Sequence, residues 1–162
     1  MRIETLRTIL IAGLFAGTLD GCAASIQYFL ATGGNPVPVF TYIASGVFGQ
    51  AAYSGGPFMA VWGVLFHYAI ATSWASLYVL LYPRIPLLSR NMFISAAFYG
   101  LFVWSMMNLV IVPLSRVRPL HPTYVKNLIG ICILVVCIGL PIALITDRRR
   151  ERLKSSSSED KE

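Results

Sequence analysis

The chain has 162 residues, of which 56% are hydrophobic and only 12% are charged, and its formal net charge is +6. A soluble domain of this size carries about 25% charged residues, so the composition excludes an ordinary soluble domain and indicates an integral membrane protein. Almost all of the charges lie outside the long apolar runs, and no basic stripe interleaved with aromatic residues is present. Nucleic acid is therefore not an expected partner.

Four apolar segments are each long enough to cross a bilayer, whose hydrocarbon core of about 30 Å needs roughly 20 residues in a helix. Helices satisfy their backbone hydrogen bonds within the segment, as lipid requires. The sequence therefore predicts an all-α integral membrane protein, a four-transmembrane-helix bundle that forms one membrane domain over residues 1–146. The spans are expected at about residues 8–30, 57–82, 92–114 and 124–146.

The connection between the first two expected spans carries no charged residue. This connection, residues 35–56, is too apolar for an ordinary solvated loop, yet it is too short and too rich in glycine to form a further span. We expect a half-helix at about residues 39–52. It lies either at the membrane interface, which we favour, or inside the bundle as a re-entrant segment.

The basic residues predict an orientation. Ten of the 13 Lys and Arg residues lie before the first span, between the second and third, or after the fourth, and the other three flank the connection between the third and fourth. Because basic residues accumulate in cytoplasmic connections, we expect both termini on the cytoplasmic side of a bacterial inner membrane. Residues 147–162 are expected to form a basic, disordered tail. In this tail Arg148, Arg149, Arg150 and Arg152 should meet lipid head-groups.

One carboxylate, Asp20, interrupts the first apolar segment, in the stretch GLFAGTLDG at residues 13–21. Gly13 and Gly17 fall on the same side of a helix as Asp20. Small residues at four-residue spacing let two membrane helices approach closely, so we expect Gly13, Gly17 and Gly21 to pack against a partner helix. A carboxylate at the middle of a span costs about 2.5–3.5 kcal/mol, so Asp20 should face protein or a wet cavity.

Two polar residues in other spans are candidate partners for this carboxylate. His67 in the second span and Asn108 in the third lie on stripes of small and aromatic residues. Together with Asp20 they are predicted to form one buried polar cluster. The cluster either joins the helices by hydrogen bonds or serves as a proton or cation relay, because histidine titrates near neutral pH. We expect Pro113 and Pro141 to kink or end their helices.

The chain offers no motif for a catalytic or metal centre. It has two histidines and three cysteines, without a CxxC pair, so no metal site, cofactor or disulfide framework is predicted. No hydrolase or nucleotide-binding motif occurs, and no catalytic residue is assigned. A rival interpretation takes LDGC, residues 19–22, as a lipoprotein cleavage box that would remove the first span. We favour the uncleaved span, because Asp20 stands where such boxes carry a small residue.

Four stretches of the chain resemble small bacterial inner-membrane proteins of the YagU-like family. They are GLFAGTLDG, YIASGVFGQAAYSGG, GVLFHYAIA and YGLFVWSMMNLVIVPLS, and they lie within residues 10–115. The resemblance implies a polytopic inner-membrane protein. It implies no reaction and no functional residue, because that family has no settled biochemical activity.

The function expected from the sequence is that of a small, non-enzymatic polytopic membrane protein. Its buried polar cluster would support assembly or the handling of a small solute or a proton. The alternatives are a proton- or ion-coupled channel or transporter that uses Asp20 and His67, and a membrane-embedded enzyme that acts on lipid. The expected partners are membrane lipids and either a second copy of the chain or the subunits of a membrane complex.

Overall fold

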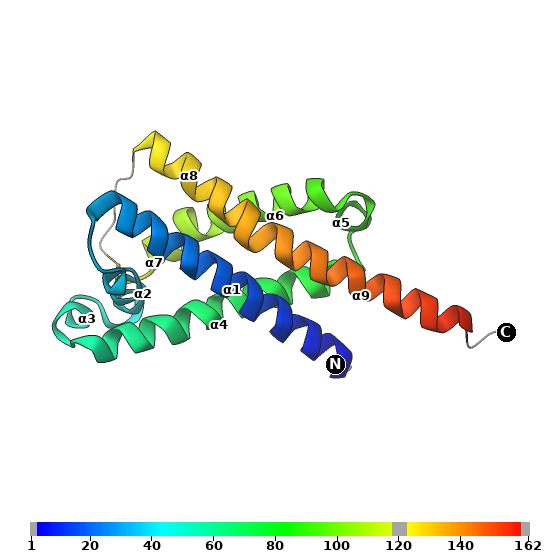
Figure 1. Cartoon of the computed structure of the whole chain (residues 1–162), viewed down its shortest axis with the longest axis horizontal. Coiled ribbons are helices and arrows are strands. Elements are labelled where there is room, and N and C mark those ends of the chain that lie inside the picture. The colour runs from blue at the N-terminus through cyan, green and yellow to red at the C-terminus, as the bar shows by residue number, and fades with distance from the viewer. Residues whose placement is uncertain (1–2, 118–122, 160–162) are drawn as a thin grey trace.

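The computed structural model describes residues 3–117 and 123–159, and every regular element in these two ranges is helical (Figure 1). Two of the elements, η1 and η2, are π-helices. The elements are α1 (Ile3–Thr32), α2 (Val37–Phe48), α3 (Ala51–Ser54), α4 (Pro57–Leu81), α5 (Pro86–Arg90), α6 (Met92–Met106), η1 (Met107–Ile111), α7 (Val112–Leu114), α8 (Tyr124–Leu134), η2 (Val135–Gly139) and α9 (Leu140–Glu159).

Four helices are long and apolar enough to cross a membrane, which confirms the helix count predicted from the sequence. The first two are α1 and α4. The third runs over Met92–Leu114, through α6, η1 and α7, and the fourth over Tyr124–Arg152, through α8, η2 and most of α9. The first extends beyond the expected residues 8–30 at both ends, because adding residues to an existing helix costs little.

The four long helices alternate in direction, so that successive helices run up and down the bundle. The start of α1 and the end of α9 lie on one side of the molecule, with α5, and α2 and α3 lie at the opposite end (Figure 1). The first side is called here the terminal end, and the side that carries α2 is called the α2 end.

The helices pack most tightly near the terminal end. Alanines let the backbones approach, and tyrosines fill the space between them. The Tyr78 hydroxyl lies 2.7 Å from Ser95 Oγ, and the Tyr99 hydroxyl donates to the Trp74 carbonyl at 2.5 Å, so the buried phenols are hydrogen-bonded. The core residues are Ala12, Ala16, Ala75, Tyr78, Tyr82, Ala96, Tyr99, Val103, Ile138, Ile142 and Ala143.

Glycine brings α6 and η2 into backbone contact. A Cβ added to Gly100 would lie 2.5 Å from the Val135 Cα, and one added to Gly139 would overlap the Ala96 carbonyl oxygen. Real side chains do not approach so closely, so only glycine fits at either position. This contact joins the third and fourth long helices.

Each π-helix ends two residues before a proline: η1 before Pro113 and η2 before Pro141. The Val112 N–H bonds to the Met107 carbonyl, five residues back, and the Leu140 N–H bonds to the Val135 carbonyl. A proline ring collides with the carbonyl four residues earlier, and the wider π turn relieves that collision. The third helix ends one residue after Pro113, as expected, whereas α9 continues for 18 residues beyond Pro141 to Glu159.

The short helix α2 crosses α4 instead of running beside it. A Cβ on Gly63 would overlap the Phe40 carbonyl oxygen, and the Phe48 ring lies 6.0 Å from Trp62 and 5.9 Å from Phe66. Phe40 and Phe48 are about 12 Å apart along a helix axis, yet both meet α4 within less than two turns. The two axes are therefore strongly inclined.

Two segments differ from their expected form. The half-helix expected at about 39–52 is divided, because α2 ends at Phe48 and Gly49 takes a φ of 62° before α3 begins. That left-handed conformation suits glycine and stops the helix. The segment Asp147–Glu159, expected to be disordered, continues α9 as helix.

Candidate functional site

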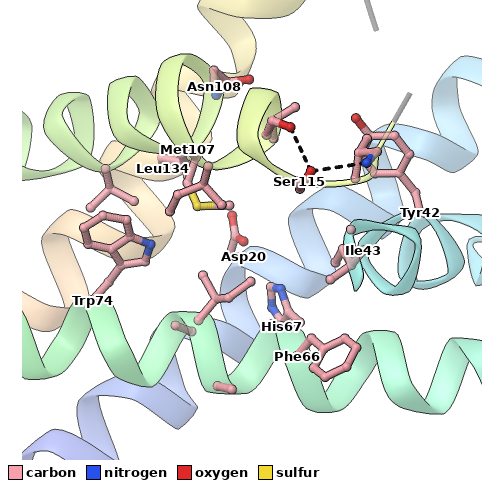
Figure 2. A pocket seen from close by; sticks show the side chains of 18 of the residues that line it. Asp20, Tyr42, Ile43, Phe66, His67, Trp74, Met107, Asn108, Ser115 and Leu134 are labelled. Atoms are coloured by element: carbon pink, nitrogen blue, oxygen red, sulfur yellow. Dashed lines mark hydrogen bonds between the residues drawn. The ribbon is translucent and has the colours of Figure 1, made fainter. Parts of the chain in front are cut away.

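A cavity of about 490 Å³ lies between the long helices on the α2 side of the tyrosine core. Every long helix and α2 contribute to its wall, which is mostly aliphatic and aromatic (Figure 2). The polar residues of the wall are Asp20, Tyr42, His67, Asn108 and Ser115. The structure thus brings all three residues of the predicted polar cluster to one cavity.

Asp20 reaches the cavity from α1. Figure 2 shows its carboxylate between His67 below it and Met107 and Leu134 above it. Asp20 interacts electrostatically with His67. No group within residues 3–117 and 123–159 donates a hydrogen bond to the Asp20 carboxylate, so its oxygens remain free to accept one from a molecule in the cavity.

His67, on α4, bonds to the backbone of α1. Its Nε2 lies 2.7 Å from the Gly17 carbonyl oxygen. A carbonyl can only accept, so Nε2 carries the proton, and Nδ1 carries a lone pair when the ring is neutral. The ring lies between Phe40, at 6.2 Å, and Tyr68, at 5.6 Å between ring centroids. In its neutral form His67 therefore has no proton to donate to Asp20.

His67 also lines a second cavity. This cavity of about 310 Å³ lies between α1 and α4, and its wall includes His67, Thr18, Cys22 and Tyr68. The Thr18 and Tyr68 hydroxyls lie 3.0 Å apart on this side. His67 thus belongs to two walls, one with a carboxylate and one with hydroxyl and thiol groups.

Asn108 is on the same cavity wall but outside the Asp20–His67 pair. Its amide nitrogen donates to the Trp104 carbonyl at 2.9 Å, within its own helix. Figure 2 shows the side chain set apart from Asp20. Asn108 was predicted to be buried with Asp20 and His67, but it is exposed and bonds within its own helix. The buried part of the predicted cluster is therefore Asp20 and His67 alone.

The predicted glycine stripe faces α4. A Cβ on Gly13 would lie 2.7 Å from the Thr72 Cα, and one on Gly17 would lie 3.0 Å from the Ala71 Cβ. A Cβ on Gly21 would lie 3.2 Å from the His67 Nε2. The close approach of α1 and α4 is what lets the His67 ring reach a backbone carbonyl on the other helix.

Two wall residues, Tyr42 and Ser115, were not among the predicted site residues. Burial, with a smaller contribution from Tyr53, raises the pKa of the Tyr42 phenol, so this phenol stays neutral at physiological pH. Ser115 Oγ donates to the Val112 carbonyl at 2.7 Å. The Arg116 N–H donates to the Gly46 carbonyl at 3.1 Å, which holds the segment after α7 against α2. This contact brings both residues to the cavity, and no pattern in the sequence predicts it.

The four arginines expected at lipid head-groups have different surroundings. Arg149 donates to the Thr5 hydroxyl at 3.0 Å, and the Arg150 guanidinium lies 5.6 Å from the centre of the Tyr82 ring. Arg148 and Arg152 are exposed. Arg149 and Arg150 therefore pack the start of the tail against the bundle, in addition to any role toward lipid.

Comparison with known proteins adds no relative. No family model, no curated protein and no solved structure matches this chain. The resemblance to YagU-like proteins therefore stays a prediction. Among the described residues no three of His, Cys, Asp and Glu lie close enough to hold a metal ion. The fold and site define a class: an all-helical bundle of four helices of membrane-spanning length, with a cavity that presents one carboxylate and one imidazole.

Proposed function

We propose that the protein is an integral membrane protein that binds a small solute in the cavity beside Asp20 and His67, without chemical conversion of that solute. In this proposal the four long helices span a bacterial inner membrane, with the terminal end in the cytoplasm. Large apolar side chains on the outside of the bundle support a lipid environment: Leu30 is 78% exposed and Leu114 83%. In water such side chains would favour aggregation.

The observation that carries the solute-binding proposal is the Asp20 carboxylate, which faces a cavity and accepts no hydrogen bond from the described residues. If Asp20 only joined helices, donors on a neighbouring helix would compensate for its removal from water. In this proposal a molecule in the cavity provides that compensation. A volume of about 490 Å³ falls within the range of small-molecule sites, about 300–1,000 Å³.

Intrinsic fluorescence provides a direct test, because Trp74 lines the cavity. In a Trp62→Phe, Trp104→Phe background, Trp74 is the single tryptophan. We expect small naphthalene derivatives to change its emission saturably in detergent. Ile70→Phe, which fills part of the cavity wall, should weaken this binding. Leu65→Phe, an exposed position on the same helix, is the matched control and should leave it unchanged.

The solute-binding proposal fails if no saturable change occurs with any derivative. It fails equally if Ile70→Phe and Leu65→Phe have the same effect on the apparent affinity, because the probe would then bind outside the cavity.

A second candidate function is a proton relay, favoured by the position of His67 on the walls of two cavities. Protonation of its Nδ1 would give the ring a second donor, while Nε2 stays bonded to the Gly17 carbonyl. In proteoliposomes this function would appear as a proton flux that Asp20→Asn and His67→Phe each abolish. Intact probe binding without any proton flux would leave solute binding as the function.

A further inference from the structure

The charge on the cavity wall has one sign, which is negative. Among the described residues that line it, Asp20 is the only carboxylate and no Lys or Arg occurs. The groups that interact electrostatically near Asp20 are His67 from α4 and Cys137 from η2, and a neutral histidine leaves the negative charge uncompensated. The wall therefore favours a ligand that brings a positive charge.

The remainder of the wall is suited to an organic body. Aromatic side chains from two elements, Tyr42 on α2 and Phe66 and Trp74 on α4, line the cavity together with aliphatic residues. Aromatic faces attract alkylammonium groups by about 0.5–2 kcal/mol, more when water is excluded. Transfer of an apolar ligand from water to an aliphatic and aromatic wall is itself favourable.

An inorganic cation fits this wall poorly. Calcium requires six to eight oxygen ligands, magnesium requires an octahedral shell, and zinc requires four nitrogen, sulfur or oxygen ligands. Asp20 and His67 provide two side chains, and no third metal-binding side chain joins them within the described residues.

We infer that the cavity selects a lipophilic monocation, a molecule with an apolar or aromatic body and a single ammonium group that pairs with Asp20. The inference rests on the proposed solute-binding function and names its ligand class. One carboxylate matches one charge, so a dication would bring an uncompensated charge into the apolar wall. An anion would meet Asp20 with like charge.

Three ligands with one aromatic body isolate the effect of charge: naphthylmethyl-trimethylammonium, naphthalenemethanol and naphthylacetate. They are titrated against the single-Trp74 protein in a nonionic detergent. We expect the cation to bind at least about tenfold more tightly than the neutral alcohol, a difference of about 1.4 kcal/mol. The anion should bind more weakly than the alcohol.

Substitutions then assign the preference to Asp20. Asp20→Asn should bring the affinity for the cation down to that of the alcohol measured in the same variant. Asp20→Glu keeps the charge and should keep the preference. Glu4→Gln removes one negative charge at an exposed position of the same helix, and this matched control should behave as the unmodified protein.

The possible outcomes distinguish the inference from the function on which it rests. If the unmodified protein binds cation and alcohol with equal affinity, and Ile70→Phe weakens that binding, the inference that the cavity selects a monocation is overturned. The proposal of solute binding then still stands. A cation preference that survives in folded Asp20→Asn protein also overturns the inference. Absence of saturable binding by all three ligands overturns both the inference and the proposal. If Asp20→Asn protein does not fold, the comparison of the three ligands in unmodified and Asp20→Glu protein decides the question.

Discussion

At the scale of single residues, the site depends on glycines, whose lack of a side chain lets two helices approach closely. Gly13, Gly17 and Gly21 let α1 approach α4 so closely that the His67 imidazole bonds to the Gly17 carbonyl. Neutral His67 has a single N–H, and the Gly17 carbonyl accepts it, so the ring has no second proton to donate to Asp20. The carboxylate is left facing the cavity, so the glycine stripe indirectly determines what Asp20 can bind.

Gly13 provides a test of this packing. We expect Gly13→Ala to lower the free energy of unfolding by about 1–3 kcal/mol, the usual effect of overpacking, because its Cβ would lie 2.7 Å from the Thr72 backbone. Unfolding in mixed detergent provides the measurement. Gly46→Ala is the matched control, since its Cβ would lie no closer than 3.5 Å to any neighbour. Equal stability of the two variants would contradict the close approach of α1 and α4.

At the scale of elements, the two π-helices shape the cavity. Met107 and Ile111 of η1 and Ile138 of η2 line it, and each π-helix is followed by a residue pair that ends in proline. A π turn contains one residue more than an α turn, so it changes the direction in which the following side chains point. The orientation of these wall residues therefore depends on Pro113 and Pro141.

Pro141→Ala restores a backbone donor and removes the ring that opposes an α turn. We expect the π turn of η2 to become an α turn. This change would rotate the helix on one side of η2 relative to the other side by about 100°, the angle of one residue. Ile138 would then move in the cavity wall, and the affinity for the naphthalene probes should fall several-fold in the Trp74 assay. Pro57→Ala, at the first position of α4 where no N–H is needed, should leave affinity unchanged. An unaltered affinity in Pro141→Ala would show that packing alone maintains η2.

At the scale of the whole molecule, the two halves of the bundle differ in character. Near the terminal end, alanines and hydrogen-bonded tyrosines close the space between helices. Toward the other end α2 lies across α4, and the segment after α7 bonds to α2, so the helices enclose a cavity. The cavity of the proposed solute site therefore lies on the α2 side of the buried core.

The proposed membrane orientation leads to a prediction for reporter fusions. A reporter active only in the cytoplasm should be active at both ends of the chain, because basic residues accumulate on that side and the start of α1 and the end of α9 lie on the same side of the bundle (Figure 1). A reporter inserted between Gly55 and Gly56, at the α2 end, should be active only outside the cytoplasm. A C-terminal reporter active outside would contradict the four-span topology and indicate that the region of α2 crosses the membrane.

The sequence by itself determined the four long helices, and it identified Asp20, His67 and Asn108 as the polar residues within three of them. A run of about 20 apolar residues has one stable backbone solution in lipid, and a lone carboxylate within such a run must face inward. The glycine face of α1 also followed from residue spacing, because helical periodicity alone places Gly13, Gly17 and Asp20 on one side.

Only the tertiary structure decided which partner each polar group takes. The bond from His67 to the Gly17 carbonyl depends on how closely two backbones approach, and sequence periodicity contains no information on that distance. The division of the half-helix at Gly49, the helical course of Asp147–Glu159 and the contribution of Tyr42 depend likewise on packing between distant segments. Local patterns describe one helix at a time, whereas a cavity is a property of several helices at once.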